Sequence, residues 1–452
     1  MMARLVLLEA RAMLLQPVTL LLAGLYLLLV LLAAGNGSDA MDRAVEAHAE
    51  AGAAAESGRT RMAERLAAPM PPEDAILTPV RVRSAILMPL PRLIDFSQGR
   101  TGFEAASAEA GLRTRPETPF RQMRLDNPAL LAIGRLDLTA VVVLAAPLLL
   151  VVLGAGLYAP DRETGVARLA LVEGGTPAPL LLARSMPRLG LVILPLFLAA
   201  GWLLMAGPEL PGRLAAAGLW LFIATLWLLA CWAAMLWLHS RRIAAETAAF
   251  AGIGGWAFFT LLLPPAILAA AGMAYPPPSR FAEIAAARAA EVRATQDWDN
   301  SHTEAEGDEA ATRLTSLRKG LAIAAETDAA VAPIRTGFAE ALARQQAFVR
   351  AASWAAPPLA VALALEDTAG TGAAAHASFR AEADRHVAAM KDKLARFVRE
   401  GRGLSPADFA ALPRFVWSAP PTPALPILLY LGMLIALLIM PAARGYRRPL
   451  FA

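Results

Sequence analysis

The sequence contains little cysteine and histidine, and both shortages limit its chemistry. Cys231 is the only cysteine among 452 residues, so no disulfide can form within the chain, and its apolar surroundings predict a packing role. The five histidines show no metal-ligand spacing. The methionines of the first polar segment show no Met-x-Met pattern that would favour copper. We therefore expect neither a metal nor another cofactor.

Three further absences exclude whole classes of function. There is no G-x-x-x-x-G-K-[ST] loop, so the chain cannot itself hold nucleotide phosphates. There is no Ser/His/Asp or Cys/His arrangement, so we do not expect an enzyme. The net charge of +4 is spread over many loops without a run of Lys or Arg, so nucleic-acid binding is not indicated.

Charge is also missing from six long apolar blocks. A membrane about 30 Å thick requires roughly 20 apolar residues in a helix, and all six blocks are near that length. We therefore predict an all-α integral membrane protein with six spans, near Val18–Ala34, Leu138–Tyr158, Leu189–Ala206, Leu214–Leu238, Ala248–Met273 and Ala424–Pro441. The first apolar block is longer than a signal-peptide core, so we expect it to be retained.

The arginines predict how these spans are oriented. Short loops with an excess of Lys and Arg face the cytoplasm. A cytoplasmic N-terminus places almost every short-loop arginine inside and leaves only Arg213 in the short outer loop. Both termini are then cytoplasmic. The expected domains are an interfacial helix and first span (1–34), a first extracytoplasmic domain (35–135), spans two to five with a cytoplasmic coupling loop at 159–188 (136–275), a second extracytoplasmic helical domain (276–415), and the last span with its tail (416–452).

The two extracytoplasmic segments have local signals of their own. Ser38 is a candidate N-cap for a helix that reaches about Ala68, beyond which repeated prolines exclude a continuous helix. Ser279 is a candidate N-cap in the second segment. There, "HASFRAEADRHVAAMKDKLARFVRE" places apolar residues from Phe379 to Phe397 every three or four positions, which predicts a helix with one buried face. "TAGTG" predicts a loop between two helices.

The spans hold no Asp, Glu, Lys or Arg in their cores. Carriers driven by protons or sodium keep ionisable groups at membrane depth, so a self-powered transporter is disfavoured. Energy for transport would have to come from a partner.

This organisation resembles the permease subunits of ABC-2-type transporters. That family has an interfacial helix with a glutamate before span one, and "LLEARAMLLQP" supplies Glu9 and Arg11 in that position. The family then has a coupling segment of the form E-R-E-x-G-T after span two. "DRETGVARLALVEGGTPAPLLLARSMPRL" is similar to it, with Val166 where threonine is common. The residues that the resemblance assigns to ATPase coupling are Asp161, Arg162, Glu163, Gly165, Arg168 and Leu169.

A narrower subgroup resembles this chain further, namely permeases with large outer helical domains, similar to those of gliding motility and copper-enzyme maturation. "NPALLAIGRLDL", "AGTGAAAHASF" and "LPRFVW" are similar to segments of that subgroup. The resemblance implies a bacterial inner-membrane permease that exports an unknown substrate or transmits motion outward. Its expected partners are an ABC ATPase subunit, a second permease copy or related permease, the lipid bilayer and a periplasmic protein. The alternative is a membrane scaffold or sensor that transports nothing and binds a partner through its outer domains.

Overall fold

A computed structural model describes residues 2–101, 104–114, 136–158, 165, 177–302 and 309–447. Six helical segments within it are long and apolar enough to cross a membrane, as the charge-free blocks predict. We call these six the span bundle: α2 (Pro17–Ala67), α6–η1–α7 (Leu138–Ala155), α10 (Pro177–Ala206), α11 (Arg213–Ser240), α12–η2–α13 (Ala245–Ala274) and α19 (Leu425–Arg447).

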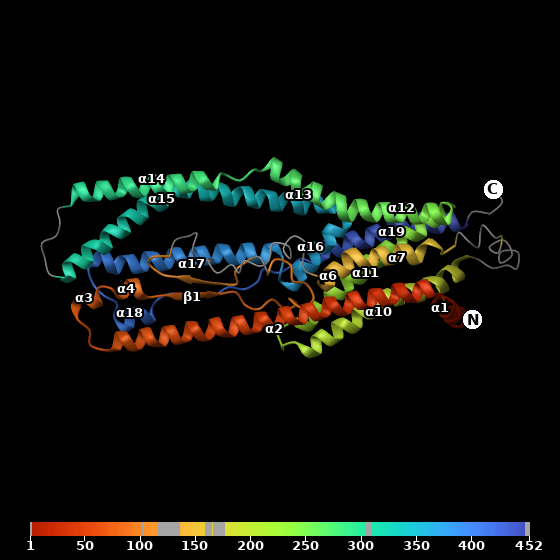
Figure 1. Ribbon diagram of the computed structural model, residues 1–452, viewed down its shortest axis with the longest axis horizontal. Helices are drawn as coiled ribbons and strands as arrows, with labels where there is room; N and C mark the ends of the chain where they lie inside the picture. The colour runs from red at the N-terminus through yellow and green to blue at the C-terminus, as the bar shows by residue number, and fades with distance from the viewer. Residues whose placement is uncertain are drawn as a thin grey trace.

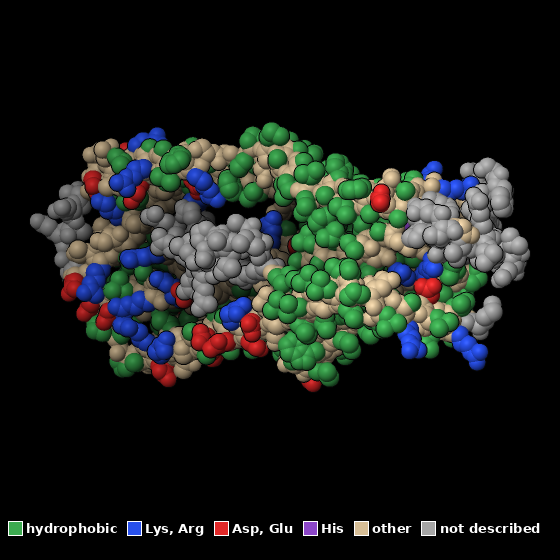
Figure 2. Space-filling model, turned by 45° about the vertical axis from the view of Figure 1, so that its right-hand side comes forward, with side chains coloured by type: hydrophobic (Ala, Val, Ile, Leu, Met, Phe, Trp, Pro, Cys, Tyr) green, Lys and Arg blue, Asp and Glu red, His purple; other side chains and the backbone are tan. Residues whose placement is uncertain are grey.

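The molecule is elongated, with the span bundle at one end and a polar, mainly helical body at the other (Figure 1). Helix α1 (Met2–Leu14) and the end of α19 lie at the far end of the span bundle (Figure 1), and we call that end the terminal face. Figure 2 shows apolar side chains over the span bundle, with charged side chains gathered on the polar body and near the terminal face. The two long polar segments therefore share one end, opposite the terminal face, as the six-span arrangement requires.

Two spans contain a wider, π-helical turn, and each turn comes just before proline. η1 (Val141–Ala145) precedes Pro147, and η2 (Phe258–Leu262) precedes Pro264 and Pro265. A proline ring cannot donate to the carbonyl four residues earlier and clashes with it in a regular helix. The wider turn lies where those carbonyls are, so it accommodates the prolines without ending the span.

The helix of the first span extends well beyond its apolar block. We predicted a new helix capped by Ser38, and this is wrong, because α2 continues unbroken for 51 residues from Pro17 to Ala67. No proline interrupts it before Pro69, and its second half is rich in helix-forming Ala, Glu and Arg. At 1.5 Å per residue, α2 is about 75 Å long and joins the span bundle rigidly to the polar body.

The remainder of the polar body is also mainly helical. α14 (Arg280–Ser301) and α15 (Glu309–Ala352) pair with each other, and α17 (Ala373–Glu400) lies beside α15. The Ser279 side chain accepts a hydrogen bond from the Phe281 amide, which confirms the predicted cap. Gly370 ends the preceding helix in a left-handed conformation within the predicted "TAGTG" loop. The shorter helices are α3 (Pro72–Ala75), α4 (Thr78–Arg81), the 3-10 turn η3 (Ser353–Ala355) and α18 (Pro406–Ala410).

The predicted face of α17 is buried. Phe379, Met390 and Leu394 are at most 2% exposed, and they form a core with the underside of a small hairpin. That hairpin consists of β1 (Ser84–Leu87) and β2 (Ser107–Ala110), which pair antiparallel with Ser84 opposite Ala110. The hairpin is a departure from the expected all-α fold, so the protein is nearly, but not entirely, helical.

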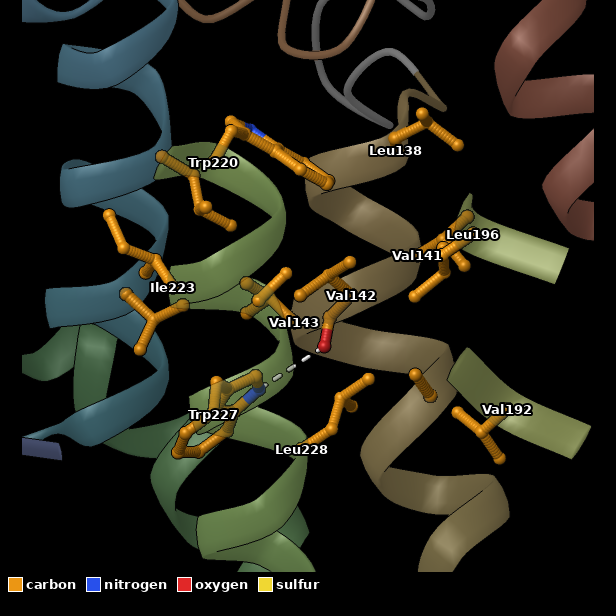
Figure 3. Packing of buried hydrophobic residues seen from close by; sticks show 14 of the residues in the cluster. Leu138, Val141, Val142, Val143, Val192, Leu196, Trp220, Ile223, Trp227 and Leu228 are labelled. Atoms are coloured by element: carbon orange, nitrogen blue, oxygen red, sulfur yellow. Dashed lines mark hydrogen bonds between the residues drawn. The ribbon is translucent and has the colours of Figure 1, made fainter. Parts of the chain in front are cut away.

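Helix α16 (Pro357–Ala369) lies within the predicted second outer segment and connects it to the span bundle. Its apolar residues pack on α11 and join the core of the span bundle. Val361 and Leu365 are fully buried there. In the same core, Trp227 donates its indole N–H to the Val142 carbonyl at 3.2 Å, a bond from α11 to the π-helical turn (Figure 3).

Candidate functional site

Most of the predicted coupling residues lie outside the described residues, namely Asp161, Arg162, Glu163, Arg168 and Leu169. Gly165 is described, and its φ of +84° is in the left-handed region that side chains avoid. A Cβ at this position would meet no atom of the described residues within 4 Å. The positive φ therefore accounts for glycine at this bend.

Helix α1 (Met2–Leu14), which we predicted to be interfacial, lies at the terminal face against α10. Its Glu9 accepts a hydrogen bond from Arg184 Nε on α10 at 3.1 Å, with both side chains about one-fifth exposed. Arg11 is exposed. Arg184 also donates from Nη1 to the Leu157 carbonyl at 2.8 Å, just past the end of α7 (Ala146–Ala155). One arginine therefore joins α1, α10 and the end of span two.

Arg188, one turn further along α10, repeats this connection. Its Nε donates to the Leu153 carbonyl at 3.0 Å, and its Nη1 donates to the Arg184 carbonyl at 2.8 Å. The last carbonyls of a helix have no partner within it, and cationic side chains are well suited to them. The two arginines therefore connect α10 to the end of α7 and, through Glu9, to α1.

Hydrogen bonds also connect spans four and six at the terminal face. His239 Nε2 is 2.7 Å from the Gly154 carbonyl, so α11 contacts the end of α7. The Tyr446 hydroxyl on α19 donates to the Leu236 carbonyl at 2.9 Å, and its ring packs edge-on against Tyr158. We call Glu9, Arg184, Arg188, His239 and Tyr446 the terminal cluster. A displacement of any one of its helices is resisted by the others.

A second polar cluster lies at the opposite end of the span bundle, and the sequence reasoning missed it. We call Leu93–Arg100, "LIDFSQGR", the junction loop; its residues from Leu93 to Gln98 are all at most 5% exposed. Asp95 pairs with Arg213 at the start of α11, with Oδ2 and Nη2 2.5 Å apart. The Phe96 ring meets Trp220 edge-on at 5.4 Å. Two features of the sequence could have indicated this cluster. Arg213 is the only arginine in the short loop "GPELPGR", and "LIDF" is a mainly apolar run within a proline-rich segment.

Backbone contacts attach the junction loop to three other helices. Gln98 N donates to the Asp137 carboxylate, which also caps α6 (Leu138–Ala140). Leu93 N donates to the Ala369 carbonyl at the end of α16. On α2, a Cβ at Gly37 would lie 1.9 Å from the Asp95 carbonyl oxygen, so only glycine permits this approach. The loop therefore fixes the polar body to α2, α6, α11 and α16.

Three carboxyl groups near the junction loop have raised pKa values, mainly because burial disfavours their charged forms. Burial raises the pKa of Asp95 to about 6, and the neighbouring Arg213 opposes this shift. The pKa of Asp137 is raised by burial. Burial and the nearby carboxylates of Asp137 and Asp367 raise the pKa of Glu366 to about 7. Asp367 itself is paired with Arg350 at 2.8 Å.

Replacing Glu366 by glutamine is expected to stabilise the protein at alkaline pH. The pKa of Glu366 is 4.5 in the unfolded chain and about 7 in the folded protein. Its contribution to stability is therefore complete below pH about 4.5 and is lost as the pH rises from there through about 7. Glu366→Gln does not titrate, so it should gain about 1–2 kcal/mol over wild type at pH 8 and little at pH 4.5; partial exposure reduces the full shift. Thermal unfolding of both proteins at the two pH values measures the difference. An equal difference at both values would contradict the raised pKa.

No group of three or more His, Cys, Asp or Glu in the described residues is arranged to hold a metal ion. His376 and His386, which we expected to be surface or partly buried residues and not metal ligands, are 2% and 7% exposed. His386 Nε2 lies 2.9 Å from the Ser84 hydroxyl, and this contact joins α17 to the hairpin.

Comparison with known protein families finds a match in the second polar segment. Residues 286–418 match the family described as "Domain of unknown function (DUF3526)". The matched part begins within α14 and ends just after the Phe379 contacts of Phe415 and Trp417. No curated protein and no solved structure matches the chain.

Proposed function

We propose that this chain is the transmembrane permease subunit of an ABC transporter of the ABC-2 type, located in the bacterial inner membrane. Its terminal face is cytoplasmic and docks a separate ATPase subunit. The subunit hydrolyses nothing and either exports a substrate or transmits ATP-driven motion to the polar body outside. A second copy, or a related permease, completes the pathway.

One observation carries the proposal, namely the Glu9–Arg184 ion pair. An ATPase that pushes on the segment 159–176 displaces the ends of spans two and three that flank it. Arg184 and Arg188 link those two ends to each other, and Glu9 extends the link to α1. The family resemblance relates Glu9 and the coupling segment only by their order in the chain. These contacts support the view that both belong to one mechanical unit.

Helix α2 and the junction loop provide a route by which motion of the span bundle reaches the polar body. α2 passes without a break from the membrane into the polar body, and the junction loop holds its Gly37 against Asp95. Movement of the span bundle is therefore delivered to the polar body by rigid contacts and not through a flexible linker.

The orientation is tested by accessibility of single cysteines in a Cys231→Ala background. Ser57 and Ser301 are exposed on the polar body, while Ala244 and Ala443 are exposed at the terminal face. Cysteines at the first two positions should react with an impermeant thiol reagent added to intact cells. Cysteines at the last two should react only after the cells are permeabilised. Labelling of Ala244→Cys from outside would exclude a cytoplasmic terminal face and, with it, ATPase docking there.

The size of the polar body supports the alternative of a scaffold or sensor that transports nothing. Co-purification separates the two functions. The permease should be isolated with a stoichiometric ATPase subunit, and Glu9→Gln should weaken that assembly or its activity. A scaffold would be isolated with an extracytoplasmic protein and no ATPase.

A further inference from the structure

The polar body contains a groove of about 330 Å³ that neither the span bundle nor the junction loop uses. Its walls are the α2 residues 52–59, strand β1 and the extended residues 412–415. Met390 of α17 and Phe409 of α18 also line it. The groove lies in the part of the molecule that our proposal places outside the membrane.

Strand β1 lines this groove with its unpaired edge. The Met88 amide donates to the Ala106 carbonyl, so Met88 is a hydrogen-bonded partner of β2. Bonded and non-bonded pairs alternate in an antiparallel ladder, so Ser84 and Ile86 also face β2. The N–H and C=O groups of Ala85 and Leu87 then point away from β2, and both residues line the groove.

No backbone hydrogen bond between described residues reaches that outward edge of β1. An exposed strand edge presents donors and acceptors at a fixed spacing, and another extended peptide backbone satisfies them best. A lipid chain or a nucleic acid would leave them unmatched. The backbone of β1 therefore favours a peptide as the occupant.

The side chains of the groove indicate which peptide it would take. Arg59, Arg83 and Arg414 line it, against Glu56 as the only acid in the lining. Across the described ranges, none of these three arginines forms an ion pair. The Arg83 guanidinium donates to the Val80 and Val82 carbonyls, and that of Arg59 lies 5.6 Å from the Phe409 ring centre. Excess positive charge beside an apolar floor favours a segment in which acidic and apolar residues alternate.

We propose that this groove, the β1 groove, binds an extended acidic segment of a partner protein by strand addition to β1. The segment pairs its backbone with Ala85 and Leu87. Its acidic side chains meet Arg59 and Arg414, and its apolar side chains pack against the half-buried Leu412 and Phe415. This inference goes beyond the proposed function because it needs no ATPase, and it holds whether the chain is a permease or a scaffold.

The test uses the full-length protein in phosphatidylcholine nanodiscs and three fluorescent peptides. The first alternates valine and glutamate, the second has lysine in place of glutamate, and the third is the glutamate peptide with alternate backbone nitrogens methylated. Fluorescence anisotropy measures binding. We expect the first peptide to bind at least about tenfold more tightly than the other two, since the second has the wrong charge and the third cannot pair with a strand.

Variants then locate the binding. Arg59→Gln combined with Arg414→Gln should weaken binding of the glutamate peptide about tenfold or more. Arg61→Gln, an exposed arginine on the same helix outside the groove, is the matched control and should have no effect. Unchanged thermal unfolding confirms that the variants are folded. Absence of glutamate-peptide binding at 1 mM, or equal binding of the methylated peptide, would overturn strand addition. Binding of decanoate in place of the peptide would assign the groove to an anionic amphiphile and would also overturn it.

Discussion

Replacing Arg213 by methionine is expected to destabilise the protein by about 3–5 kcal/mol, because Asp95 would then be a buried charge without a partner. Arg213 and Asp95 are 4% and 1% exposed, and Arg213 also donates to the Leu203 and Pro208 carbonyls. The loss should be greater at pH 8 than at pH 5, because protonation of Asp95 removes the unpaired charge at the lower pH. Thermal unfolding of the variant and of wild type in detergent, at both pH values, measures this loss of stability.

The matched control for this variant removes both charges. Asp95→Asn combined with Arg213→Met should recover part of the stability, since no buried charge remains. A single Arg213→Met variant as stable as wild type would mean that the junction loop does not hold the polar body to the span bundle.

Replacing Met390 by aspartate is expected to cost several kcal/mol and to unfold the polar body, because a carboxylate would be buried in an apolar core. Met390 is 2% exposed and packs in one core with Phe379 and Leu394. Met390→Leu conserves volume and should cost less than about 1.5 kcal/mol. Protease resistance of residues 373–400 and thermal unfolding report the difference. Equal stability of the aspartate and leucine variants would contradict burial of this face.

The spans could be predicted from sequence because their signal is the absence of charge, which depends on no neighbour. Helix caps were partly predictable, because a capping side chain bonds only to the backbone of its own helix. Ser279 caps its helix as expected, whereas Ser38 lies inside α2, because the helix-forming residues on both sides outweigh a single capping side chain. Helix ends are therefore decided by the whole segment and not by one residue.

Features made by distant segments could not be predicted. The β1–β2 pairing, the insertion of α16 into the span bundle and the burial of "LIDFSQGR" each depend on contacts between residues far apart in sequence. At the terminal face, the family resemblance identified Glu9, but its partner Arg184 emerged only from the fold. Gly165 was expected to serve either a bend or a close approach, and its positive φ supports the bend.

The most direct measurement of the central claim is the ATPase rate of the protein reconstituted with the ATPase subunit that co-purifies with it. Glu163→Ala and Gly165→Leu should leave assembly and the polar body intact but lower the stimulated rate by up to about tenfold, as expected for a coupling contact worth about 1.4 kcal/mol. Glu246→Ala, an exposed acid at the start of α12, is the control and should retain the full rate. If both coupling variants assemble as wild type does and stimulate the ATPase fully, the segment after span two does not couple the two subunits and is only a connecting loop.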